Sequence, residues 1–129
     1  MPHILAVALE NHPGALSDVL DLLSKNKFNV SGIEAEALGD FGRARILVDD
    51  SARAAKILRK KGYDVVEAEA IELDLPNKPG ELARVMKALA AAKVNVVSLY
   101  GTTPSPTGSP RLLLRVNNAA QAKAALGLV

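Results

Sequence analysis

The chain has 129 residues, of which 49% are hydrophobic and 23% charged, a composition that is typical of globular proteins and excludes a disordered chain. The absence of cysteine excludes disulfides, thiolate catalysis and cysteine-ligated metal sites. A net charge of +2 and a pI of about 9.0 do not indicate nucleic-acid binding, because lysines and arginines are interspersed with acidic residues.

The first segment predicts a strand and no export signal. Residues 4–9 are uniformly apolar, as in a buried strand. The run stops at Glu10 and follows no basic segment, so it is too short for a signal peptide or a membrane span. We therefore expect a cytoplasmic protein that has no membrane partner.

The following elements alternate between helix and strand. A helix is predicted over residues 16–23, where apolar residues recur at i, i+3, i+4 and i+7. Strands over 28–38 and 45–48, joined by a turn at 39–42, predict a hairpin. Asp49, Asp50 and Ser51 supply capping groups for a second helix, which ends at Gly62. Residues 63–70 are predicted to form the next strand.

The chain then repeats itself. Residues 77–99 match residues 11–33 at nine of 23 positions, 66 residues apart. Core positions vary among hydrophobic residues, whereas the Asn, Pro and Gly of the motif N-x-P-G-x-L recur unchanged. The Asn-Val pair that opens the next strand also recurs. We interpret this pattern as a tandem duplication.

The element order predicts the α+β class, with two tandem ferredoxin-like βαββαβ units, each an antiparallel sheet with both helices on one face. We place the first domain at residues 1–69 and the second at 70–129. The second copy has a hairpin loop over Thr102 to Pro110 and is expected to lack a full last strand. The bare sheet edge that results predicts a dimer or a higher oligomer.

The repeated Pro-Gly indicates a helix start that is adapted to binding. Pro13 is expected at the first helical position, where its missing N–H is not needed. Gly14 is a poor helix former, and the usual benefit of glycine is the close approach of a ligand or a backbone. A helix start offers free N–H groups and the positive end of the helix dipole, which suit a carboxylate.

These residues resemble the ACT domain, a small-molecule-sensing module attached to many amino-acid biosynthetic enzymes. The resemblance rests on N-x-P-G-x-L, an amphipathic helix, and Asn-Val at the start of a strand, and it covers nearly the whole chain as two copies. It is closer to the free-standing tandem ACT proteins, where Asp40-Phe41-Gly42, Val48-Asp49-Asp50 and Tyr100 also have counterparts.

The resemblance implies that an amino acid lies where two ACT units pack side by side. One unit would supply its first loop and helix start, and its neighbour the opening of its second strand. One site would then combine Asn11, His12, Pro13, Gly14, Ala15 and Leu16 with Asn95, Val96 and Leu99. The other would combine Asn77, Pro79, Gly80, Glu81 and Leu82 with Asn29, Val30, Ser31 and Ile33.

The same resemblance places the ligand's carboxylate at the helix-start N–H groups, its ammonium at the Asn oxygens and its side chain against Val, Ile and Leu. We therefore expect a small or branched aliphatic amino acid. The loop that contains Asn11 is expected to be the stronger site, because Glu81 in the second copy would repel a carboxylate.

No catalytic residue, metal or cofactor is predicted. His3 and His12 are the only imidazoles, and neither has a defined nucleophile partner in the sequence, so we expect a binding protein and not an enzyme. Two functions stay open. The chain is either an amino-acid sensor that regulates a partner such as a biosynthetic enzyme, or an oligomerisation and interaction module that binds no metabolite.

Overall fold

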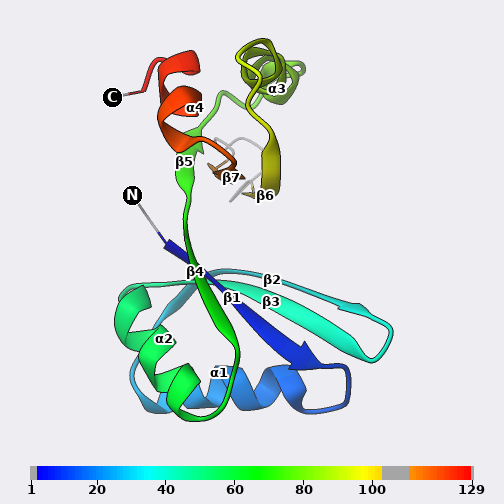
Figure 1. The fold of residues 1–129 in the computed structure, drawn as a ribbon, viewed down its shortest axis with the longest axis vertical. Helices are drawn as coiled ribbons and strands as arrows, with labels where there is room; N and C mark the ends of the chain where they lie inside the picture. The colour runs from blue at the N-terminus through cyan, green and yellow to red at the C-terminus, as the bar shows by residue number, and fades with distance from the viewer. Residues whose placement is uncertain (1–2, 103–110, 129) are drawn as a thin grey trace. The chain divides into compact units, whose positions relative to one another are not determined.

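The computed structural model describes residues 3–102 and 111–128, which form two compact units (Figure 1). One unit is His3–Glu69, and the other comprises the described residues from Ala70 onward. Except for Thr102, the hairpin loop predicted over Thr102 to Pro110 lies outside the described residues.

The first unit is a four-stranded antiparallel sheet with two helices on one face (Figure 1). Its elements are β1 (His3–Glu10), α1 (Ala15–Lys25), β2 (Val30–Leu38), β3 (Phe41–Val48), α2 (Ser51–Lys60) and β4 (Val65–Glu69). The strand order β2-β3-β1-β4 is the ferredoxin-like arrangement, so the predicted fold is confirmed.

The core of this unit forms where alternate strand residues meet the apolar stripes of the helices. The fully buried residues with 0% or 1% exposure are Leu5, Val7, Val19, Leu23, Ala44, Ile46, Ala54, Ala55 and Leu58. The opposite face of β2 and β3 carries charges instead. There Arg45 lies 2.7 Å from Glu34, and Arg43 lies 3.6 Å from Glu36.

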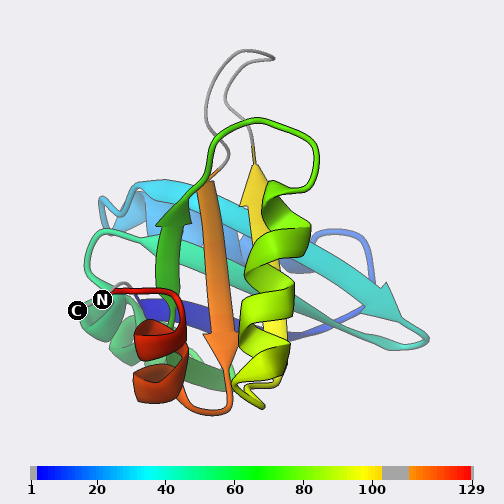
Figure 2. The same ribbon diagram turned by 90° about the horizontal axis from the view of Figure 1, so that it is seen from above.

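The second unit repeats this architecture with three strands. Its elements are β5 (Ile71–Asp74), α3 (Glu81–Ala91), β6 (Val96–Thr102), β7 (Arg111–Val116) and α4 (Ala119–Ala125). The strand order β5-β7-β6 reproduces β1-β3-β2, and both helices cover one face (Figure 2). No strand follows α4 among the described residues, as predicted. The predicted oligomer stays a prediction.

The duplication extends to unusual details of the backbone. Lys27 and Lys93, which are 66 residues apart, both have positive φ, at 64° and 59°. Both β2 and β6 have a register shift directly after their first residue. Asp50 and Asn118 cap α2 and α4 in the same way, each accepting a hydrogen bond from the backbone N–H three residues later. The two units are therefore copies in conformation as well as in sequence.

The helices are short. The longest among the described residues, α1 and α3, have 11 residues each. Within the described part of the chain, none combines the length and the hydropathy that a membrane-spanning helix needs.

Candidate functional site

The β1–α1 loop of the first unit is hydrogen-bonded to the tip of the β2–β3 hairpin. The Nδ2 of Asn11 donates a hydrogen bond to the carbonyl oxygen of Gly39 at 2.8 Å. Its backbone N–H donates to the carbonyl oxygen of Asp40, also at 2.8 Å. The two bonds fix the side-chain amide, and Oδ1 has no partner among the described residues. The exposed Asn11 can therefore offer this oxygen to a donor group of a ligand.

Gly14 sets the start of α1, and here the sequence prediction for Pro13 is wrong. The helix begins at Ala15, so Pro13 lies before the first helical position. Gly14 is the N-cap, with φ 90° and ψ −13°, a left-handed conformation that glycine adopts far more readily than other residues. A Cβ at this position would meet no atom within 4 Å. The glycine is therefore required by the backbone conformation and not by a close approach within the chain.

The first turn of α1 leaves backbone donors available. Ala15 donates its N–H to the His12 carbonyl oxygen at 3.2 Å, and Asp18 donates to that of Gly14 at 2.9 Å. The N–H groups of Leu16 and Ser17, which lie between them, have no hydrogen-bond partner among the described residues, as is usual at a helix start. Both lie at the positive end of the helix dipole, where an anion is favoured.

The equivalent loop of the second unit has the same backbone and a different charge. Gly80 is the N-cap of α3 with φ 88°. Glu81 follows it, and its carboxylate accepts hydrogen bonds from Nε and Nη2 of Arg84 at 3.2 and 3.1 Å. Because this ion pair offsets the charge of Glu81, the repulsion of a ligand carboxylate is weaker than the sequence alone indicates. Leu82 in the first turn is 42% exposed.

Within each unit, the loop before the first helix and the opening of the second strand lie at opposite ends of the sheet. In the first unit, β2 opens with Val30 opposite Val48 and closes with Leu38 opposite Phe41, beside the Asn11 loop. The predicted residues Asn29, Val30, Ser31 and Ile33 therefore cannot join the loop of their own unit. The same holds for Asn95, Val96 and Leu99 relative to Asn77, Pro79, Gly80, Glu81 and Leu82, because β6 also opens at the far end of its sheet. The predicted combination of halves from different units stays a prediction.

A groove of about 230 Å³ runs between the β1–α1 loop and the hairpin, and we call it the loop groove. Four of the predicted loop residues line it, together with residues from β1, β2 and β3. The lining residues are Leu9, Glu10, Asn11, His12, Ala15, Leu16, Ala35, Glu36, Ala37, Gly42 and Arg43. The loop groove thus brings the side chain of Asn11 and the start of α1 into one concave site.

The alanines of β2 are the residues that the sequence analysis missed. Ala35 and Ala37 alternate with charged residues, and Ala35 is paired with the buried Ala44 on the helix-facing side of the sheet. Nevertheless both are exposed, because their small side chains leave space beside α1. Two alanines at strand positions where a core normally requires bulky residues are the signal that could have indicated the groove.

Two glycines shape the hairpin that forms the other wall. Gly39 lies in the turn with φ 64°. A Cβ on Gly42 would lie only 2.7 Å from the carbonyl oxygen of Glu36, so any side chain there would force the two strands apart. Gly42 therefore has a steric role, and the Gly of the Asp40-Phe41-Gly42 motif is explained by the hairpin.

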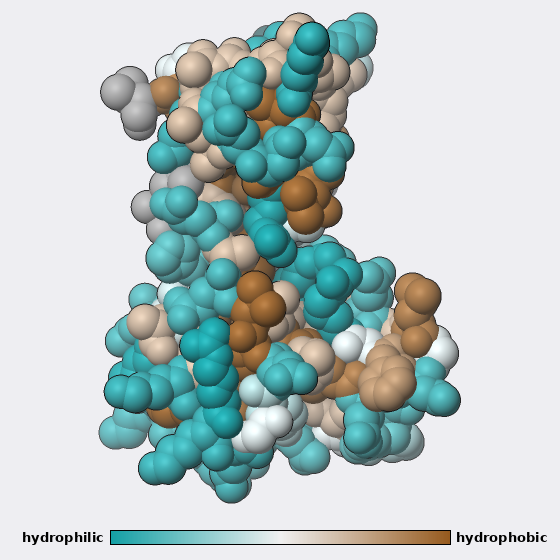
Figure 3. Space-filling view, in the orientation of Figure 1, coloured by the Kyte–Doolittle hydropathy of each residue, from teal (hydrophilic) through white to brown (hydrophobic). Residues whose placement is uncertain are grey.

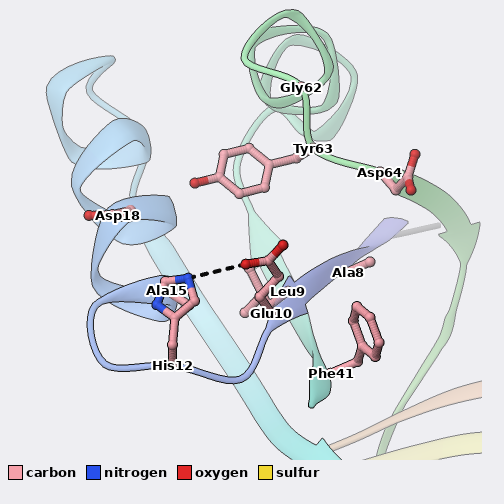
Figure 4. A pocket seen from close by; sticks show the side chains of 10 residues that line it. All are labelled: Ala8, Leu9, Glu10, His12, Ala15, Asp18, Phe41, Gly62, Tyr63 and Asp64. Carbon is pink, nitrogen blue, oxygen red and sulfur yellow. Dashed lines mark ion pairs between the residues drawn. The ribbon is translucent and has the colours of Figure 1, made fainter.

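A second pocket, of about 420 Å³, lies on the other side of the loop, and we call it the acidic pocket. It is lined by Ala8, Leu9, Glu10, His12, Ala15, Asp18, Phe41, Gly62, Tyr63 and Asp64 (Figure 4). His12 turns toward Glu10, and its Nε2 lies 3.6 Å from Oε2 of that residue. Its Nδ1 lies 2.9 Å from the Pro13 carbonyl oxygen. Three carboxylates make this pocket a poor place for the carboxylate of a ligand.

Comparisons with known proteins agree with this architecture. A family model described as an ACT domain pair matches residues 2–128. A solved structure of a protein from Bacteroides thetaiotaomicron is 28% identical with a TM-score of 0.89, and the match covers 98% of this chain and 86% of that one. The ligand-free regulatory subunit of aspartate kinase from Thermus thermophilus is 17% identical with a TM-score of 0.70, over 97% of this chain and 87% of that one.

The corresponding subunit from Thermus flavus is also 17% identical, with a TM-score of 0.68 and coverage of 98% and 90%. Curated proteins give no significant match. The family model spans both units, and each unit has the strand order and loop geometry described above. The chain therefore belongs to the ACT domain family, as a pair of ACT domains.

Proposed function

We propose that the protein is a regulatory module that binds a small amino acid in the loop groove of its first unit. The observation that carries this proposal is the convergence, in one groove, of Asn11, the start of α1 with Leu16, whose backbone N–H is unpaired, and the small apolar side chains of β2. These three features match the three parts of an aliphatic amino acid: ammonium, carboxylate and side chain.

Each part of the ligand has a chemically suited partner. The N–H groups of Leu16 and Ser17 would donate to the carboxylate, which the helix dipole also favours. Oδ1 of Asn11 would accept from the ammonium, because Nδ2 is already committed to Gly39. The apolar side chain would contact Leu16, Ala35 and Ala37.

The size of the groove limits the ligand. Its volume of about 230 Å³ lies below the roughly 300–1,000 Å³ of pockets for drug-sized molecules, which suits a small or branched aliphatic amino acid. A module of this kind is expected to bind with a Kd in the roughly micromolar to millimolar range, or about −8 to −4 kcal/mol.

The opening of a second strand from another ACT unit would complete the site. Under this proposal Asn95, Val96 and Leu99 would close over the Asn11 loop, and Asn29, Val30, Ser31 and Ile33 over the Asn77 loop. Because Glu81 is paired with Arg84, we propose the second loop as a further candidate site.

The proposed regulatory role rests on membership of the ACT domain family; the regulatory subunits of aspartate kinase share the fold, at identities that show the fold alone. We accordingly propose that the chain acts on another protein, such as a biosynthetic enzyme, and catalyses no reaction itself. The alternative is an interaction module that uses the ACT fold to associate and binds no metabolite.

A thermal-shift screen against the twenty amino acids at millimolar concentration tests the proposal, because a ligand that prefers the folded state raises the melting temperature. Asn11→Ala should reduce the rise, with a loss of about 1–3 kcal/mol of binding if the amide pairs with a charged group. Asn77→Ala tests the second loop in the same way.

Asn26→Ala is the matched control. Asn26 also donates its side-chain amide to a backbone carbonyl, that of Leu22 at 2.9 Å, but lies at the other end of α1. The control should lower the melting temperature slightly and keep the full response to the amino acid. Twenty flat curves for the wild-type protein would reject the sensor and favour the interaction module.

A further inference from the structure

The end of the β2–β3 hairpin exposes hydrophobic side chains that the ligand site does not use. Leu38 is 79% exposed and Phe41 is 67% exposed, the two highest values among the large hydrophobic residues of the described chain. The two residues are direct cross-strand neighbours, so this exposure is concentrated at one place. Figure 3 shows hydrophobic side chains gathered at the end of the hairpin. Exposed apolar clusters of this kind mark interaction sites.

Phe41 belongs to the Asp40-Phe41-Gly42 motif, and only its glycine is explained by the hairpin itself. No hydrogen bond or core contact requires an aromatic residue at position 41, because the side chain lies outside the buried core of its unit. The fold of the unit therefore does not explain the exposed aromatic ring, whereas contact with another molecule would.

The charges beside this cluster are arranged in two stripes. On the face of the sheet opposite the helices, β2 presents Glu34, Glu36 and then Leu38, and β3 presents Arg45, Arg43 and then Phe41. The cross-strand register pairs each acid with an arginine, at 2.7 Å for Glu34 and Arg45 and 3.6 Å for Glu36 and Arg43. One strand of the hairpin is thus acidic and the other basic on this face.

This arrangement is self-complementary. A two-fold axis that runs parallel to the hairpin, between its strands, would place β2 of one copy against β3 of the other. Glu36 would then face Arg43 of the partner copy, and Leu38 would face its Phe41. A partner surface of a single charge would instead meet one of the two stripes with a like charge.

We propose that the outer face of the β2–β3 hairpin, centred on Leu38 and Phe41, is a self-association surface that docks a second copy of this chain. Two-fold pairing buries both apolar side chains and brings each acidic stripe onto a basic one. The proposal concerns association alone and does not depend on the binding of an amino acid.

Sedimentation-velocity ultracentrifugation without any amino acid, over about 1 to 100 µM protein, tests this surface. Leu38→Lys should weaken self-association by about a hundredfold, because each two-fold dimer contains the substitution twice and a lysine that replaces a central apolar contact costs about tenfold per copy. Val97→Lys, at a position 52% exposed in the second unit, is the matched control and should leave association unchanged.

A charge exchange provides the specific test. Glu36→Arg alone places arginine opposite arginine, Arg43→Glu alone places acid opposite acid, and each should weaken association. Equimolar mixing of the two variants should restore a dimer, because the arginines at positions 36 and 43 of one copy then face the glutamates at positions 43 and 36 of the other. A loss of fold in either variant would not give this recovery, so the test separates association from stability.

The outcomes decide the proposal. The proposal is supported if the wild-type protein associates with rising concentration, if Leu38→Lys weakens this association, and if mixing Glu36→Arg with Arg43→Glu restores it. A wild-type protein that is monomeric throughout the concentration range overturns it, as does association that is identical in the wild-type protein, Leu38→Lys and the unmixed charge variants. The proposed amino-acid site is tested separately by the thermal-shift screen, in which the response to an added amino acid is compared at one fixed protein concentration.

Discussion

Replacement of Gly14 by alanine should destabilise the first unit through the backbone alone. Gly14 has φ 90°, and a left-handed conformation costs an L-residue roughly 1–2 kcal/mol. No steric cost is added, because a Cβ would meet no atom within 4 Å. Alanine also reduces the entropy of the unfolded chain, which offsets roughly 0.4–1 kcal/mol. The expected net loss in the free energy of unfolding is about 1 kcal/mol.

Urea unfolding followed by circular dichroism measures this loss, and thermal unfolding should show a fall of about 4–8 °C for a unit of this size. Gly14→Asn should lose less, because asparagine tolerates the left-handed region better than alanine. Gly80→Ala should cause a similar loss in the second unit, where φ is 88°. A Gly14→Ala protein as stable as the wild type would refute the claim that the left-handed N-cap requires glycine.

Three further substitutions test the described architecture by urea unfolding. Asp50→Ala should cost about 1 kcal/mol, since its side chain caps α2, and an unchanged midpoint would show that the cap is dispensable. Leu23 and Leu89 occupy equivalent core positions that are 1% exposed. Leu23→Ala and Leu89→Ala should each lower the free energy of unfolding by about 2–5 kcal/mol, and a loss under 1 kcal/mol for either would contradict its burial. Lys27→Gly should stabilise the protein by about 0.5 kcal/mol. Glycine removes the strain at φ 64°, but it also raises the conformational entropy of the unfolded chain, which offsets part of the gain. Destabilisation would show that the lysine side chain contributes a contact.

The fold could be predicted from the sequence because local patterns and the duplication point to the same architecture. The helical periodicity of residues 16–23 and the capping residue Asp50 specify elements that the structure contains. Element ends were less accurate. A strand predicted to begin at residue 28 begins at Val30, because Lys27 first turns the chain through a positive φ.

The candidate site was only partly predictable. The motif indicated Asn11 and Gly14, since Asn and Gly recur at the same positions of both copies. Ala35 and Ala37 were missed because an alanine in a strand has no local signature, and its effect depends on the space that neighbouring elements leave. The role of Arg84 beside Glu81 was missed for a similar reason. The two residues are three positions apart in the sequence, but only the structure shows that their side chains form an ion pair that offsets the charge of the loop.

Binding at the loop groove is tested most directly by a ¹H–¹⁵N NMR titration of the intact chain with the amino acid that gives the largest rise in melting temperature. The account predicts saturable shifts of the backbone N–H signals of Leu16 and Ser17 and of the Asn11 side-chain amide. Asn11→Ala should weaken the shifts at Leu16 and Ser17, and Asn26→Ala should not. Saturable binding that leaves these three signals in place would contradict it.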